Sequence, residues 1–121
     1  MTDDFPDRTD HDPVYFWNIL HWGHAAVDLT AGRRVEDLAR DREFRLRLGY
    51  LLTQVGVSAS KVSALTRWTL PALPWDWFIE TADELLASEH EPDQMLLWRT
   101  VTEILPPFLV ELESAIEDEI V

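Results

Sequence analysis

Apolar residues recur at three- and four-residue spacing along most of the chain, the period of an amphipathic α-helix. The first such stripe consists of Phe16, Ile19, Leu20, Gly23 and Val27. Asp12-Pro13 precedes it, and this pair favours a helix start because Asp caps helix N-termini and Pro suits the first turn. Gly32 follows it, as glycine commonly does after the last helical residue. We therefore expect a first helix over residues 13–31.

The longest apolar stripe lies in the middle of the chain and predicts a second, longer helix. Its members are Phe44, Leu48, Leu51, Leu52, Val55, Ala59 and Val62. Residues 36–40 are expected to form a short separate turn before it. Within the stripe, Gly49 and Gly56 each cost roughly 1 kcal/mol of helix propensity relative to alanine. We expect another helix to approach closely on the side of these two glycines.

The second half of the chain predicts further helices with short connections. Residues 67–74 contain two prolines and are expected to form a loop, followed by a helix over residues 75–87. Residues 88–92 would form a tight connection, and Asp93 would cap the next helix. Pro106-Pro107 is expected to break that helix and leave a final short one from Phe108 onward.

The order of these elements defines a fold class. No segment alternates apolar and polar residues as a half-buried strand does. The sequence therefore predicts an all-α fold, an antiparallel (up-down) helical bundle of about four to five helices. At 121 residues the chain is expected to form one domain over residues 13–121, after an acidic flexible tail over residues 1–12.

The net charge of the chain limits the kinds of molecule that it is expected to bind. The formal net charge is −13, with twelve acids and one base, Arg99, in residues 80–121. A field of this sign opposes RNA binding, because affinity for nucleic acid comes largely from Lys and Arg on phosphates. Residues 33–47 hold six of the ten basic residues, interleaved with four acids. We expect these arginines to form internal salt bridges, with contact to the acidic helices of a second copy as the alternative.

Cysteine and cofactor motifs are absent from the sequence. Without cysteine there are no disulfides and no thiolate ligands, which fits a cytoplasmic location. No apolar run reaches the roughly 20 residues of a membrane span, so no membrane association is expected. Neither the GxGxxG nor the P-loop pattern occurs, and we expect no cofactor.

Several segments of the sequence resemble one family. These are YFWNIL, DLARD, LTQVGVSASKVS, PWDWFI and DQMLLWRTVTEILPPF. Together they resemble the HepT-like family of the HEPN superfamily, the toxins of HepT/MntA-type toxin–antitoxin pairs. The last segment is similar to the family pattern D-x-x-x-x-W-x-T-V-x-x-x-L-P-x-L and is the most specific. The resemblance covers residues 14–117 and implies a HEPN-type bundle, a homodimer and a nucleotidyltransferase antitoxin as partner.

The same resemblance locates the family's catalytic motif and shows that it is degenerate here. HepT-like ribonucleases carry Arg-x4-His-x-Tyr, in which His moves protons and Arg stabilises the developing phosphate charge. In this sequence Ala82 stands at the arginine position, Ala87 at the histidine and Glu89 at the tyrosine. His90 lies three residues beyond the histidine position and is a weak substitute. The resemblance therefore implies a protein without catalytic residues, and with no tyrosine for the antitoxin to modify.

Three other groups carry possible chemistry. His21, His24 and Asp28 share one face of the first helix and are weak candidates for a divalent metal site; an ordinary polar face or a dimer-interface cluster is the simpler interpretation. The carboxylates Glu80, Asp83, Glu84, Glu89 and Glu91 are candidates for a cation site or an acid–base pair, or else for a solvated surface. Trp68 and Trp77 are candidates for an interface, whereas core or loop-anchoring roles are expected for Trp75 and Trp98.

These observations lead to three hypotheses about function. The first is a HepT-like protein without ribonuclease activity that acts by protein binding, possibly to a nucleotidyltransferase; on this hypothesis the protein is not an enzyme. The second is an active ribonuclease toxin with a rearranged site around His90 or around His21 and His24. The third is an acidic protein-binding module unrelated to toxin–antitoxin systems.

Overall fold

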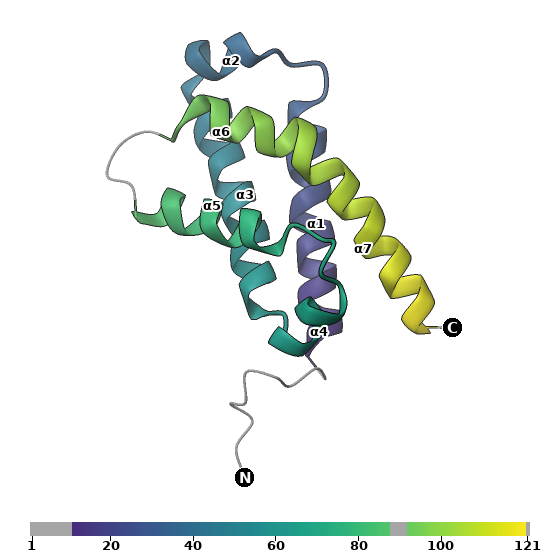
Figure 1. Cartoon of the computed structure of the whole chain (residues 1–121). Coiled ribbons are helices and arrows are strands. Elements are labelled where there is room, and N and C mark those ends of the chain that lie inside the picture. Colours follow the sequence, from purple (N-terminus) through teal and green to yellow (C-terminus); the bar gives the residue numbers. More distant parts are fainter. Residues whose placement is uncertain (1–10, 88–91, 121) are drawn as a thin grey trace.

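The computed structural model describes residues 11–87 and 92–120, and these residues are helical almost throughout (Figure 1). They contain no strand, so the predicted all-α helical bundle is confirmed. The helices are α1 (Asp12–Thr30), α2 (Val35–Arg40), α3 (Arg42–Lys61), α4 (Ala64–Thr69), α5 (Trp75–Ala87), α6 (Gln94–Arg99) and α7 (Leu105–Ile120), with a π-helical segment η1 (Thr100–Ile104) between the last two.

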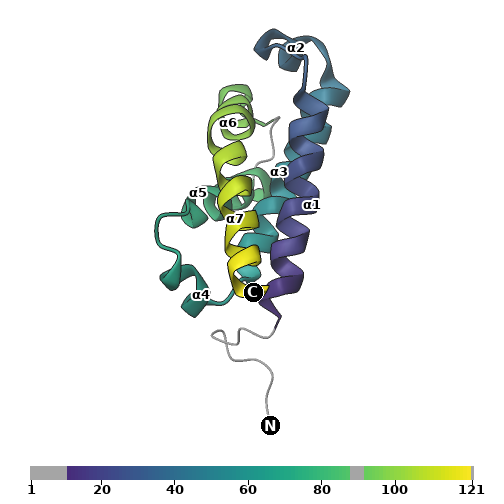
Figure 2. The same ribbon diagram turned by 90° about the vertical axis from the view of Figure 1, so that its right-hand side faces the viewer.

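The bundle has two layers. The long helices α1 and α3 run antiparallel side by side, and α5, α6 and α7 all lie on one side of this pair (Figures 1 and 2). In that second layer α5 packs mainly on α3, and α7 mainly on α1. The short α2 closes one end of the molecule, while α4 lies at the other end, near the start of α1.

The hydrophobic core fills the space between the two layers. Its centre is an aromatic group in which the rings of Phe78 and Phe108 stack at 4.6 Å and Trp75 meets Phe108 edge-on at 5.4 Å. The core-facing stripes predicted for α1 and α3 supply much of the remainder. The largest fully buried side chains are Phe78, Phe108, Ile19, Leu38, Leu48, Leu52, Leu97, Leu105, Leu112, Val55, Val62 and Thr100.

Most predicted helix boundaries agree with the structure to within a residue. The first helix, the short turn before the long one, and the helix over residues 75–87 are all present. Asp93 caps α6 as expected, because its side chain accepts hydrogen bonds from the backbone N–H groups of Met95 and Leu96. The predicted connection over residues 88–92 lies, except for Pro92, outside the described residues.

The prediction that Pro106-Pro107 breaks the last helix is wrong. The chain stays helical from α6 through η1 into α7, and the wider π turn ends at Ile104, one residue before the prolines. At this junction the backbone N–H of Leu105 bonds to the carbonyl oxygen of Thr100, five residues back. Since prolines lack an N–H and crowd the preceding turn, widening that turn removes the clash that would otherwise kink the helix.

Two smaller differences concern helix starts. Residues 67–69, expected in a loop, form the end of α4, because Ser63 caps this helix by accepting from the N–H of Thr66. Asp12, expected as a cap, is instead the first residue of α1 and caps nothing. Its carboxylate is committed to a contact with a distant part of the chain, described below.

None of the helices in the described part of the chain combines the length and the apolar character needed to cross a membrane.

Candidate functional site

The segment that resembles the family's catalytic helix forms α5, and its position 82 lies in the contact with α3. Ala82 is only 2% exposed. A Cβ atom built on Gly56 of α3 would lie 2.4 Å from the Cβ of Ala82 and 2.2 Å from the carbonyl oxygen of Phe78. The backbone of Gly56 therefore touches α5 directly, which confirms the close approach predicted there. Position 82 has room for a methyl group and not for an arginine.

Of the other motif positions, the structure describes Ala87, which does not join Ala82 in a common site. Ala87 is the last residue of α5 and is exposed, whereas Ala82 faces α3. Glu89, Glu91 and His90 lie outside the described residues. The position of the family arginine thus faces the core contact, and the position of the family histidine faces solvent.

The outward face of α5 is acidic. Glu80, Asp83 and Glu84 are all exposed. A carboxylate that serves in acid–base chemistry is usually shielded from water and placed beside a second titratable group. Exposure of all three side chains fits a solvated surface, and the same surface would repel the phosphates of RNA.

The polar residues predicted on one face of α1 do lie together, at an open hollow of about 490 Å³. It is lined by Trp17, Leu20, His21, His24, Ala25 and Asp28. The Nε2 atom of His24 lies 2.7 Å from Oε1 of Glu113 on α7, so this side chain links two helices. The ring of His21 packs edge-on against Trp22 at 5.0 Å. Nowhere in the described chain do three His, Asp or Glu side chains come together as a metal site.

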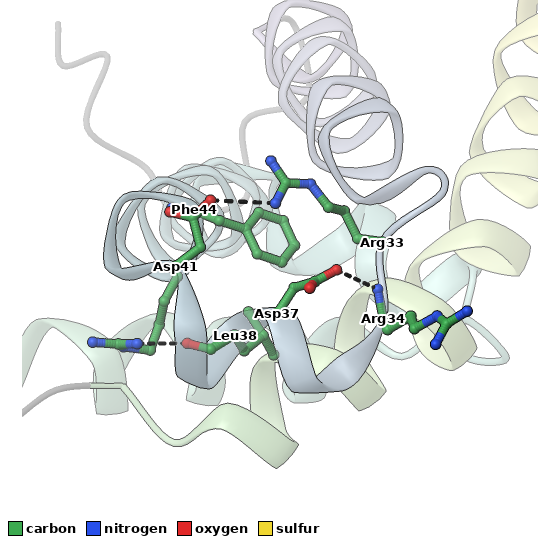
Figure 3. Close-up of polar contacts among 7 residues, drawn as sticks. Arg33, Arg34, Asp37, Leu38, Asp41 and Phe44 are labelled. Atoms are coloured by element: carbon green, nitrogen blue, oxygen red, sulfur yellow. Dashed lines mark hydrogen bonds and ion pairs between the residues drawn. The ribbon is translucent and has the colours of Figure 1, made fainter.

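The arginine-rich segment is held largely by contacts within itself (Figure 3). Arg33 lies 3.2 Å from Asp41 and stacks over the Phe44 ring at 4.5 Å. The buried Arg45 donates to the carbonyl oxygen of Leu38 and so fastens α2 to α3. Arg47 pairs with Glu43 at 3.6 Å, as the i,i+4 spacing predicts. Internal pairing is therefore a principal use of these arginines.

One carboxyl group in this segment has a shifted pKa. The side chain of Asp41 caps α3 by accepting from the N–H of Phe44. This hydrogen bond, together with the Arg33 guanidinium, lowers the pKa of Asp41 below its ordinary value. Both interactions favour the charged carboxylate. They therefore stabilise the junction of α2 and α3 more strongly at pH values at which Asp41 is ionised.

A contact between α5 and η1 was not expected from the sequence. The indole N–H of Trp77 donates to the hydroxyl of Thr100 at 2.9 Å, and Thr100 is fully buried. Arg99 stacks over the Trp77 ring at 5.1 Å. Trp77, considered as an interface residue, thus serves mainly to join two helices. Trp75 is buried as expected, and Trp98 is half-buried. Trp68 alone of these four is strongly exposed, at 77%.

A second unexpected contact joins the start of α1 to α4. The Asp12 carboxylate, 6% exposed, accepts from the backbone N–H and the hydroxyl of Ser63, each at 2.8 Å, and from the hydroxyl of Thr66. The Ser-x-x-Thr spacing is a recognisable helix-start signal. No periodic pattern, however, connects it to a residue 51 positions earlier in the chain.

Comparison of the chain with models of protein families, with curated proteins and with solved structures finds no match. The resemblance to HepT-like proteins therefore rests on the sequence segments quoted above.

Proposed function

We propose that this protein is a HepT-like protein of HEPN type that lacks ribonuclease activity and acts by binding other proteins. The observation that carries the proposal is the environment of Ala82. The family motif needs an arginine there, and in this chain the position is buried where α5 touches Gly56 of α3. An arginine at position 82 would force α3 and α5 apart. The close packing of these two helices therefore accounts for the small side chain at this position.

The charge of the surrounding surface supports the same proposal. Next to the motif positions α5 exposes Glu80, Asp83 and Glu84. From α5 to Glu117, the only basic residue in the described part is Arg99, which stacks on Trp77 and lies 3.9 Å from Glu103. An RNA-cleaving site needs positive charge to hold the phosphate, and this layer offers negative charge instead.

Assays on RNA separate the proposal from the ribonuclease alternative. Purified protein incubated with total RNA is expected to leave it intact, as are the variants His90→Ala and His21→Ala/His24→Ala. Cleavage by the wild-type protein that disappears in either variant would show a rearranged catalytic site and overturn the proposal. Cleavage that is unchanged in all variants and stays with the protein through further purification would also overturn the proposal, because it would place the activity at other residues of the chain.

The implied partner provides a second test. The family resemblance implies a homodimer and a nucleotidyltransferase antitoxin, which modifies the motif tyrosine. With Glu89 at that position, binding is expected without modification. A nucleotidyltransferase encoded beside this chain should co-purify with it, while the intact mass of this chain stays that of the unmodified protein. Absence of any such neighbouring reading frame would favour the acidic binding module unrelated to toxin–antitoxin systems.

A further inference from the structure

Helix α4 turns its large apolar side chains toward solvent. Trp68 is 77% exposed, and Leu65, three residues earlier on the same face, is 50% exposed. None of the six residues of this helix is buried. A short helix that buries no side chain gains little from the hydrophobic core, so its position depends on other contacts. We define the α4 apolar face by Leu65 and Trp68.

The start of α1 supplies these contacts and brings the N-terminal segment of the chain beside α4. The Asp12 carboxylate accepts hydrogen bonds from Ser63, which caps α4, and from Thr66 in its first turn. Residues 1–10 lie outside the described residues, and they join the structure at His11. The Asp12 contact therefore fixes the point at which this segment begins, within two residues of a hydrogen bond to α4.

Residues 1–10 are long enough to reach the α4 apolar face. The six residues of α4 make a helix about 9 Å long. Phe5 lies seven residues before Asp12, and seven residues of extended chain span up to about 23 Å. Phe5 can therefore reach any point along α4 without a change in the described helices.

The charges around α4 are opposite to those of the N-terminal segment. From residue 44 to residue 75 the sequence has no acidic residue. Lys61, just before α4, is exposed, and Arg67 of α4 is partly exposed. Residues 1–10 contain four aspartates and one arginine. In a chain with a net charge of −13, the region around α4 is thus able to attract an acidic segment.

We propose that residues 1–10 bind to α4, with Phe5 against the α4 apolar face and the aspartates beside Lys61 and Arg67. A pair of aromatic rings stabilises such a contact beyond the area that it buries. Because the segment is attached next to α4, its effective concentration there is in the millimolar range, so a weak contact is enough. The bound segment closes the α4 apolar face to other proteins. This inference does not rest on the proposed function.

Fluorine NMR of the full chain, labelled with 5-fluorotryptophan, tests the contact. The variant Trp68→Phe identifies the Trp68 resonance. Phe5→Ser should shift this resonance toward that of free 5-fluorotryptophan. It should leave unchanged the resonance of Trp98 on α6, which lies near α2 at the other end of the molecule (Figure 1). Sodium chloride at about 1 M should cause part of the same shift, because salt screens the aspartates from the basic side chains.

Introduced cysteines measure the position of the segment independently, since the chain has none of its own. Thr2→Cys combined with Thr69→Cys, at the exposed end of α4, should form an intramolecular disulfide on mild oxidation. Adding Phe5→Ser should slow this reaction about fivefold, as expected for the loss of one partly buried aromatic side chain. Thr9→Ser, in the same segment, is the matched control and should leave the rate unchanged.

The proposal requires both effects of Phe5→Ser, and the absence of either would overturn it. A Trp68 resonance that changes when the wild-type chain is diluted would also overturn it, because a second copy would then cover α4. Circular dichroism checks that Phe5→Ser keeps the helical content of the wild-type chain. None of these results bears on the absence of ribonuclease activity, which the RNA assay tests separately.

Discussion

Replacing Gly56 by alanine should destabilise the protein, although alanine is the better helix former. The added Cβ would lie 2.2 Å from the carbonyl oxygen of Phe78 and 2.4 Å from the Cβ of Ala82. Carbon atoms pack at about 3.5–4.0 Å, so α5 would have to move by more than about 1 Å. Both neighbouring atoms belong to the backbone or are fixed to it, and no side-chain rotation relieves the overlap.

The magnitude follows from two opposing contributions. Alanine gains about 1 kcal/mol of helix propensity over glycine. Overpacking a close contact costs about 1–3 kcal/mol, and a backbone clash lies at or above the upper end of that range. The net loss is about 2 kcal/mol, which corresponds to a fall in Tm of roughly 8 °C for a domain of this size.

Gly49, seven residues earlier in α3, provides the matched control. Among the residues that the structure describes, its added Cβ would meet the ring of Pro92 alone, at 3.4 Å, which is ordinary contact. Gly49→Ala should therefore keep most of the propensity gain and raise the stability by up to about 1 kcal/mol. Urea unfolding followed by circular dichroism measures both variants. If Gly56→Ala proves as stable as the wild-type protein, the close contact between α3 and α5 is refuted.

Three further predictions use the same unfolding assay. Ala82→Arg should lower the free energy of unfolding by at least about 3 kcal/mol, because it buries a large charged side chain in the α3–α5 contact. Ala87→His, at the exposed end of α5, should change it by no more than about 0.5 kcal/mol. Equal effects of the two variants would contradict the burial of position 82. Asp12→Ala should lower the free energy of unfolding by about 2–4 kcal/mol, since it leaves the buried N–H and hydroxyl of Ser63 without their acceptor. It should also speed amide hydrogen exchange in α4. Unchanged exchange in α4 would contradict a stabilising contact between Asp12 and Ser63. The pKa of Asp41 is lowered in the folded state, so this group stabilises the protein above its unfolded pKa of about 3.8 and loses that effect as the pH falls through the lower folded value. Asp41→Asn keeps a capping side chain, and the difference in stability between wild type and variant should shrink as the pH falls below 3.8; a difference that does not depend on pH would exclude the charge as its source.

The sequence predicted where most helices lie because that information is local. The stripes of α1 and α3 and the Asp93 cap depend on residues within a few positions of one another. The error at Pro106-Pro107 has a similarly local origin. Proline normally breaks a helix, and no residue pattern indicated that η1 would widen the turn before the two prolines.

The candidate site was only partly predictable. The residues at positions 82, 87 and 89 differ from the HepT-like motif that the segment resembles, and the sequence alone shows this difference. The burial of Ala82, however, depends on Gly56 of another helix, and the two residues are related only by the way α3 crosses α5. The helical spacing correctly predicted that His21 and His24 lie on one face of α1. It did not predict the contact between His24 and Glu113 of α7.

The sequence by itself determined the helical class, the apolar face of each long helix and the identity of the residues that stand at the motif positions of the family it resembles. These follow from periodicity, capping and residue identity, all of which act over one or two turns. The tertiary structure decided which faces meet. It placed Gly56 against Ala82 and tied Asp12 to Ser63 across 51 residues. Such choices depend on how all the helices share one core, and no local pattern records them.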